Sequence, residues 1–158
     1  MITTRTATAA DVTTLAALNA VVHDLHARTR PDIFVTAPAV DALEALLTEQ
    51  LAEPGVTFVL AETPDGRAVG YAMARVVERP ASVLALPETF VSLQQIAVDP
   101  TAARGGVGTA LLEQVRAIGR AAGCRRLVTQ VRDFNEDAYA FYRSAGLSPV
   151  TRTLEQAL

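Results

Sequence analysis

The sequence predicts an α/β fold in which helices pack on one mixed β-sheet. Glycine and proline divide its 158 residues into apolar segments with strand-like or helix-like spacing. The tight turn Pro64-Asp65-Gly66 joins two strand-like segments into an antiparallel hairpin. Two later helices each separate strand-like segments, and such connections return the chain to a parallel neighbour. The predicted order is β-α-α-β-β-β-α-β-α-β.

The first half of the chain is predicted to contain three strands and two helices. Leucine and valine recur behind Asp11 at spacings of 3, 4 and 3 residues, which indicates an amphipathic helix with Asp11 as its N-cap. A second helix is closed by Pro54-Gly55. The predicted elements are a strand at Ile2–Thr6, helices from Asp11 to about Arg28 and at about Val40–Leu51, and strands at Val56–Glu62 and Arg67–Val77.

The second half is predicted to hold the parallel part of the sheet. One helix carries an apolar stripe that should bury against the sheet and fix the helix N-terminus at the sheet edge; its members are Val107, Leu111, Val115, Ile118 and Ala122. The predicted elements are strands at Glu88–Val98, Arg125–Arg132 and Leu147–Leu154, and helices at Val107–Ala122 and Asn135–Ala145.

Composition and length restrict the class of protein. Half of the residues are hydrophobic and no repeat or linker interrupts them, so residues 1–158 are predicted to form a single domain. The net charge of −3 provides no basic surface for nucleic acid. No apolar run approaches the ~20 residues that span a bilayer, and no signal peptide precedes the first strand. We therefore expect a cytoplasmic protein without nucleic-acid or membrane partners.

A glycine-rich turn between a strand and a helix, within Gln95–Leu112, is the strongest functional signal in the sequence. Free backbone amides, the helix dipole and the small size of glycine make such a turn a site for an anion. It is not a P-loop, because no lysine follows its glycines. It is not a dinucleotide fingerprint either, because the third glycine position is Leu111.

Two motifs resemble the GNAT acetyltransferase superfamily. Arg104-Gly105-Gly106-Val107-Gly108-Thr109 resembles its pyrophosphate loop, [QR]-x-x-G-x-[GA], although the [QR] position falls on Ala103. The second motif, N-x-x-A-x-x-F-Y-x-x-x-G-[FL], is matched at Asn135, Ala138, Phe141, Tyr142, Gly146 and Leu147. The motifs occur in the expected order with a helix and a strand between them.

This resemblance implies the GNAT fold, acetyl-CoA as co-substrate, and a set of cofactor-binding residues. The loop residues Arg104, Gly105, Gly106, Val107, Gly108 and Thr109 would hold the pyrophosphate. Main-chain groups of Ile96, Ala97 and Val98 would run beside the pantetheine arm. Asn135 would bond that arm, or serve as a helix N-cap, or do both. Tyr142 would lie beside the thioester.

Tyr142 is the candidate catalytic residue. A phenol of pKa near 10 is suited to protonate a departing thiolate of pKa about 8.5. The alternative is a core aromatic on the last helix, since Tyr139, Phe141 and Tyr142 cannot all face one way. The resulting hypothesis is acetyl transfer to a primary amine of a small molecule or peptide. The alternative hypothesis is a non-catalytic CoA-binding relative, which Gln94 and Ala103 would favour.

The general base is not evident from the sequence. An alkylamine of pKa ~10 is about 0.1% neutral at pH 7, so its deprotonation needs help. Some relatives carry a glutamate where this chain has Gln94, whose amide cannot accept a proton. Glu88, His26, Asp32 and an ordered water are the candidates.

No metal site is expected, although two histidines lie close together in the sequence. His23 and His26 are three residues apart on the first predicted helix, but no H-E-x-x-H pattern accompanies them. A homodimer is expected from the apolar faces of the first helices and the last strand.

Overall fold

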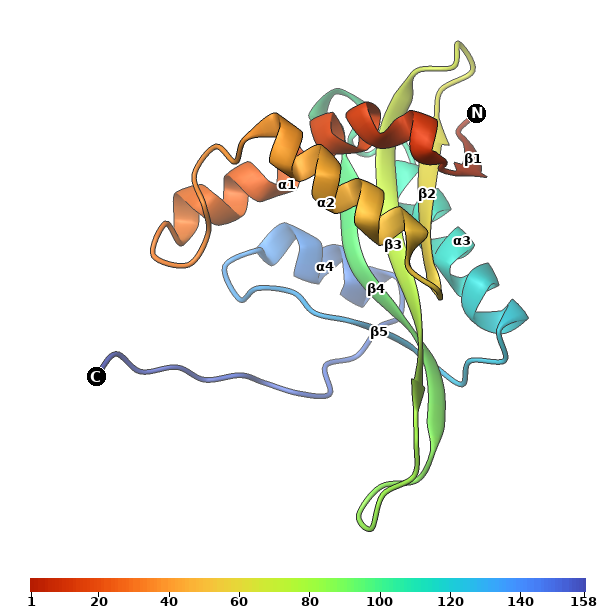
Figure 1. The fold of residues 1–158 in the computed structure, drawn as a ribbon, viewed down its shortest axis with the longest axis vertical. Helices are drawn as coiled ribbons and strands as arrows, with labels where there is room; N and C mark the ends of the chain where they lie inside the picture. Colours follow the sequence, from red (N-terminus) through yellow and green to blue (C-terminus); the bar gives the residue numbers. More distant parts are fainter.

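A five-stranded mixed sheet forms the centre of the computed structural model, which describes residues 1–158 (Figure 1). The first three strand pairs are antiparallel, and the last pair is parallel. The predicted mixed α/β fold is thus confirmed. The strands lie side by side in chain order: β1 (Thr3–Thr6), β2 (Val56–Glu62), β3 (Ala68–Arg79), β4 (Glu88–Val98) and β5 (Leu127–Thr129).

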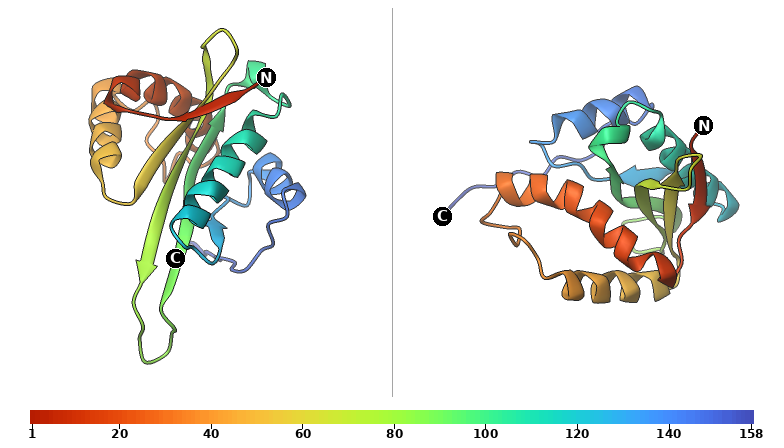
Figure 2. Two further views of the ribbon diagram at one scale, coloured as in Figure 1. Left: turned by 90° about the vertical axis from the view of Figure 1, so that its right-hand side faces the viewer. Right: turned by 90° about the horizontal axis from the view of Figure 1, so that it is seen from above.

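Helices cover both faces of the sheet (Figure 2). One face carries α1 (Val12–Thr29) and α2 (Val40–Ala52), and the other carries α3 (Val107–Ala121) and α4 (Glu136–Ser144). Two short 3₁₀ turns, η1 (Ala9–Asp11) and η2 (Pro100–Ala102), precede α1 and α3. None of these helices combines the length and the apolar character that crossing a membrane requires.

Alternation along the central strands divides the hydrophobic core into two layers. In β2, Phe58 and Leu60 pack toward α1 and α2, whereas Val59 and Ala61 pack toward α3. A strand covered on both faces is apolar at consecutive positions, which explains the unbroken run in β2. Leu15 of α1 is fully buried, so its truncation to alanine should destabilise the fold by about 2–5 kcal/mol.

The predicted last strand, Leu147–Leu154, is wrong. The chain beyond α4 has no regular structure, and Figure 1 shows it leading away from the sheet. A strand needs a partner for its backbone groups, and no strand lies beside this segment. Pro149 also removes one donor. Without this neighbour, β5 forms only at Leu127–Thr129 instead of Arg125–Arg132.

Two smaller expectations at helix boundaries also need correction. Asp11 directly precedes α1, but its carboxylate accepts from the Thr8 N–H at 2.8 Å and not from an amide of α1. Ala122, expected in the buried stripe of α3, is exposed, and Gly119 is buried in its place.

Candidate functional site

Strands β4 and β5 pair over three residues and then separate. The last aligned pair is Leu93 with Thr129, and the Thr129 hydroxyl donates to the Leu93 carbonyl at 2.9 Å. Beyond this point β4 continues from Gln94 to Val98 without a neighbouring strand on that side. The register between β3 and β4 shifts at the same place, which leaves Gln94 without a partner. The sheet therefore has an open slot along the second half of β4.

Backbone groups of β4 point into this slot. Asp99 donates its N–H to Val69 of the β3 side at 2.8 Å. Because successive residues of a strand present their backbone groups to opposite sides, Val98 and Ile96 present theirs to the slot. Ala97 presents its groups toward β3, and its side chain is buried. The open edge can thus accept an extended ligand as an additional strand would be accepted.

The glycine-rich loop lies at the end of the slot, where α3 begins. The backbone N–H groups of Gly106, Val107, Gly108 and Thr109 donate to no group of the protein, and the first bond of α3 runs from Ala110 N–H to the Gly106 carbonyl at 2.9 Å. Four consecutive free amides at a helix N-terminus form a binding site for an anionic group.

The loop backbone is shaped to expose these amides. Gly106 has φ +80°, which only glycine adopts without cost, and a Cβ there would meet no atom within 4 Å. Arg104 has φ +62°, a conformation that costs a residue with a side chain about 1–2 kcal/mol. Its guanidinium makes no hydrogen bond or ion pair, so it is available to an anion. The residues present therefore fit a pyrophosphate.

Close packing fixes the loop relative to β4. A Cβ on Gly70 of β3 would lie 2.8 Å from the Ala97 carbonyl oxygen and 2.9 Å from a Val107 methyl group. The Cβ of a residue at position 108 would lie 3.2 Å from the Phe141 ring of α4. The two glycines thus allow β3, β4, α3 and α4 to meet around the slot without intervening side chains.

Tyr142 lies at the point where the slot begins. It is 7% exposed and belongs to the core layer that also contains Leu93 and Leu112. Burial raises its pKa above 10, an effect that the Thr129 side chain partly offsets. Thr129 is the residue at which β5 leaves β4. The hydroxyl of Tyr142 is therefore close to the separation of the strands.

Asn135 is the N-cap of α4. Its Oδ1 accepts from the Ala138 N–H at 3.2 Å, whereas its amide NH₂ has no partner in the protein. The predicted N-cap role is therefore observed. The free donor leaves Asn135 able to bind a ligand at the same time.

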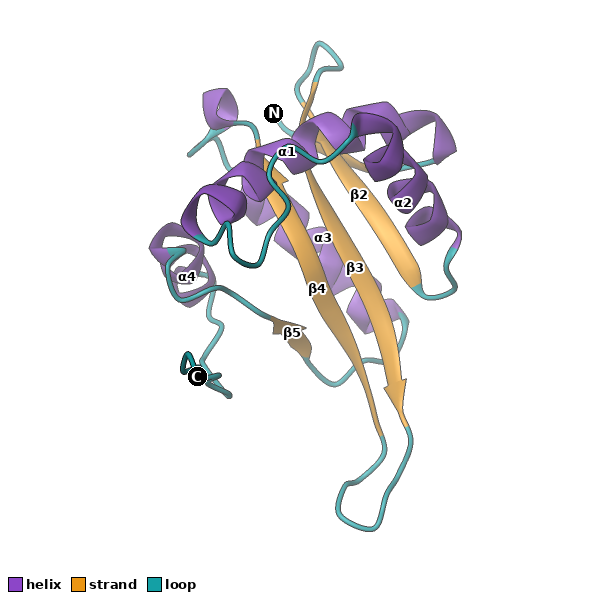
Figure 3. Cartoon of the chain, turned by 60° about the vertical axis from the view of Figure 1, so that its left-hand side comes forward, coloured by secondary structure: helices purple, strands orange, loops and turns teal.

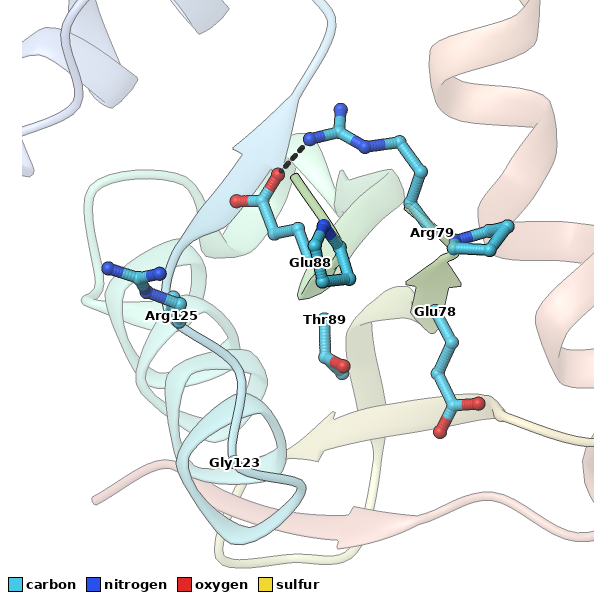
Figure 4. A pocket seen from close by; sticks show the side chains of 8 residues that line it. Glu78, Arg79, Glu88, Thr89, Gly123 and Arg125 are labelled. Carbon is cyan, nitrogen blue, oxygen red and sulfur yellow. Dashed lines mark hydrogen bonds and ion pairs between the residues drawn. The ribbon is translucent and has the colours of Figure 1, made fainter. Parts of the chain in front are cut away.

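Two of the candidate bases are engaged elsewhere. Glu88 lies at the base of the long β3–β4 hairpin, where Arg79 and Arg126 bind it; Figure 4 shows the first of these pairs in a hollow lined by charged residues, threonine, proline and glycine. It precedes Ile96 by eight residues, or about 26 Å of strand. Asp32 is bound to Arg30 at 2.8 Å and is exposed. In both cases the arginine lowers the carboxyl pKa, which weakens the group as a base.

His26 and His23 have different surroundings. The Nε2 atom of His23 lies 2.6 Å from the Val35 carbonyl, so this ring is held by the backbone. His26 makes no hydrogen bond through its ring and is half-buried among Phe34 and Phe134. Burial is the main cause that lowers its pKa, and the positive charge of Arg132 and the His23 ring add to it.

Sequence reasoning missed a polar network under the slot. Tyr71 donates its hydroxyl to the Gln95 side-chain oxygen at 2.6 Å, and the Asn19 amide donates to Tyr71 at 2.8 Å. Burial raises the pKa of Tyr71 to about 12. These residues come from β3, β4 and α1, and no spacing in the sequence relates them. The network links α1 to β4 directly before Ile96.

Comparison with known proteins identifies the family. The model of the acetyltransferase (GNAT) family matches residues 19–147, which include the slot, the loop and Tyr142. The chain belongs to the GNAT family. A curated relative, aminoglycoside N(6')-acetyltransferase type 1 of Stenotrophomonas maltophilia, is 36% identical over 117 residues, covering 73% of this chain and 74% of that protein.

Solved structures of other proteins have the same fold. A tetramutant of the BH1408 protein from Bacillus halodurans superposes with a TM-score of 0.92 at 25% identity, over 99% of both chains. The aminoglycoside N-acetyltransferase AAC(6')-Iy in complex with CoA superposes with a TM-score of 0.76 at 20% identity, over 100% of this chain and 95% of that one. This protein is an acetyl-CoA-dependent N-acetyltransferase, and the catalytic interpretation is confirmed over the non-catalytic one.

Proposed function

We propose that this GNAT enzyme acetylates a primary amine of a small molecule by direct attack of the amine on the thioester. The main observation in support of this proposal is the row of four free backbone amides from Gly106 to Thr109, which lies at the end of the open edge of β4. An anionic head group with an extended amide-containing arm matches both features, because the first needs donors at one place and the second needs a strand to pair with. Acetyl-CoA has this shape.

Each part of the slot has a task in binding. The amides of the loop and the Arg104 guanidinium would hold the pyrophosphate, and the open space at Gly106 leaves room for its approach, while Gly105 and Gly108 let the loop pack against Ala102 and Phe141. Backbone groups of Ile96 and Val98 would bond the pantetheine arm, with Ala97 supporting them from the β3 side. The free amide NH₂ of Asn135 would donate to the same arm. The bound co-substrate supplies an acetyl group on a thioester.

Tyr142 would act as the general acid. Its raised pKa keeps the hydroxyl protonated at neutral pH, so it can donate a proton to the sulfur as the C–S bond breaks. The kcat should therefore not decrease through loss of this acid as pH rises, until the phenol ionises near or above pH ~10.

The Tyr142→Phe variant tests this role. It keeps the ring that packs in the core and removes only the hydroxyl, so kcat should fall about 10²–10⁴-fold while the affinity for acetyl-CoA changes little. The assay follows thiol release under single-turnover conditions and the affinity by calorimetry. Near-full kcat with chemistry rate-limiting would make Tyr142 a packing residue and leave the protonation to solvent.

The acceptor class is best sought among compounds with several amines. The curated relative and three of the solved neighbours carry the name aminoglycoside acetyltransferase, which supports an aminoglycoside as acceptor. A panel of neamine, spermidine and triglycine, assayed with acetyl-CoA and thiol detection, separates an aminoglycoside, a linear polyamine and a peptide N-terminus. Turnover of triglycine alone would replace the small-molecule proposal with a peptide substrate.

A further inference from the structure

Three aromatic rings from distant parts of the chain meet beside the slot. His26 of α1 stacks on Phe34 with ring centroids 5.2 Å apart and meets the edge of Phe134 at 5.5 Å. The Arg132 guanidinium lies 5.2 Å from the centre of the Phe34 ring. We call His26, Phe34, Phe134 and Arg132 the aromatic cluster. It joins α1, the loop after α1 and the loop between β5 and α4.

The position of the cluster follows from the course of α1. Asn19 of α1 contacts Tyr71 and Gln95, so α1 crosses β3 and β4 at this residue. His26 follows seven residues later, which is two helical turns, and therefore lies on the same face about 10.5 Å further along. Figure 3 shows the end of α1 passing beyond β4 toward α4. His26 thus lies over the region where β4 and β5 have separated.

Phe134 reaches the cluster from the opposite side of the slot. It lies five residues after Thr129, where β5 leaves β4, and directly before Asn135, the N-cap of α4. The contact between His26 and Phe134 therefore joins the end of α1 to the loop on the far side of the slot.

We propose that His26, within the aromatic cluster, accepts the proton that the attacking nitrogen loses. The proposal deepens the proposed function, on which it rests, by naming the missing base. His26 is suited to this task because both ring nitrogens lack a partner in the protein, unlike those of His23. The other two side chains named as candidate bases, Glu88 and Asp32, are instead paired with arginines.

The charges around His26 favour a neutral base and a neutral amine. Its lowered pKa leaves the imidazole uncharged at pH 7. The charged and titratable groups that act on it are Arg132 from the β5–α4 loop and His23 from its own helix. The same positive charge and the apolar rings would lower the pKa of an ammonium group bound beside them, which increases its neutral fraction.

The proton and electron balance is complete with groups already named. The nitrogen lone pair attacks the thioester carbon, the C–N bond forms, and the electron pair of the C–S bond leaves on sulfur. His26 takes one proton from nitrogen and later releases it to solvent. Tyr142 gives a proton to sulfur and is reprotonated from solvent. The products are the N-acetyl amine and the free thiol of CoA.

The test compares His26→Gln with Glu88→Gln in the full-length protein. The first variant should lose about 10²-fold in kcat/KM with the fastest acceptor among neamine, spermidine and triglycine, at unchanged acetyl-CoA affinity by calorimetry. The wild-type profile should show activity falling as pH drops through a pKa below 6.5, because protonated His26 cannot act as a base. This acidic limb should be absent from His26→Gln and retained in Glu88→Gln.

A second variant separates proton transfer from packing. Imidazole added to His26→Ala should restore part of the activity, which a purely structural role of the ring would not permit. Wild-type turnover with an unchanged acidic limb in His26→Gln, or no rescue by imidazole, would overturn the assignment of His26 alone. Binding of acetyl-CoA without transfer to any of the three amines would instead overturn the proposed function together with it.

Discussion

Replacing Gly106 by valine should abolish acetyl-CoA binding while the fold is retained. Gly106 has φ +80°, and Gly123, at the other end of α3, has φ +71°. A Cβ at either position would meet no atom within 4 Å. The two glycines are therefore matched in backbone strain and in the absence of steric contact, but only Gly106 lies among the free amides. Gly123→Val is the control.

The expected magnitudes differ between stability and binding. A β-branched residue in the left-handed region costs about 1–3 kcal/mol, which lowers the melting temperature by about 2–12 °C at ~2–4 °C per kcal/mol for a chain of this size. Both variants should show this loss. At Gly106 the branched side chain also displaces the pyrophosphate from at least two amides, at about 1.5–3 kcal/mol each. The affinity should thus fall about 10²–10⁴-fold.

Calorimetric titration with acetyl-CoA and thermal unfolding of both variants provide the measurement. Gly123→Val should bind as the wild type does, whereas Gly106→Val should show no measurable heat at micromolar concentrations. Equal affinity in the two variants, with both folded, would show that the free amides do not form the anion site. Equal loss in both would show that the effect is transmitted through the helix and not through the loop.

Three further predictions concern stability and assembly. Gly119→Ala should destabilise in urea by about 1–2 kcal/mol despite its better helix propensity, because the new Cβ would lie 2.6 Å from a Val91 methyl group. Val91→Ala is itself destabilising, but the additional loss caused by Gly119→Ala should be smaller in that background. Asp11→Asn should lower the melting temperature at pH 7 by about 2–4 °C, because Arg5 and Thr8 hold the Asp11 pKa well below its usual range. This difference should shrink as pH falls below about 4, since protonation removes the same stabilisation in the wild type. Light scattering should give the mass of a homodimer, since Val83, Leu84 and Leu86 on the β3–β4 hairpin are at least 80% exposed; a monomer at high concentration would contradict this.

Local sequence signals predicted the parts of the fold that depend on neighbours in the chain. The bounds of β4 agree with the prediction, because a run of apolar residues follows a proline-rich loop and ends at Pro100. The start of α3 at Val107 agrees as well, because two glycines directly precede its apolar stripe. The predicted strand at Leu147–Leu154 failed because strand formation depends on a partner, and the local apolar pattern contains no information about one.

The site was predictable only where its residues are close in sequence. The loop from Arg104 to Thr109 is a continuous motif, and its free amides are a property of a helix start. The contact of His26 with Phe134 joins residues 108 positions apart, and the arginine partners of Glu88 come from β3 and from the segment before β5. Such contacts arise when separate elements meet in the folded chain, α1 with the β5–α4 loop in the first case and β4 with β3 and β5 in the second, and no motif in the sequence indicates them.

Gly70 has a consequence for the kind of carrier that this enzyme accepts. Its missing side chain lets β3 approach the Ala97 carbonyl and the first residue of α3 at the same time. The span between the loop amides and the start of the slot is therefore set inside the hydrophobic core, where no loop can flex to adjust it. In the proposed binding mode, this fixed span would set the length of the arm between the pyrophosphate and the acyl group. A change in the length of the accepted carrier would therefore require a substitution at Gly70, a core residue that would not contact the carrier.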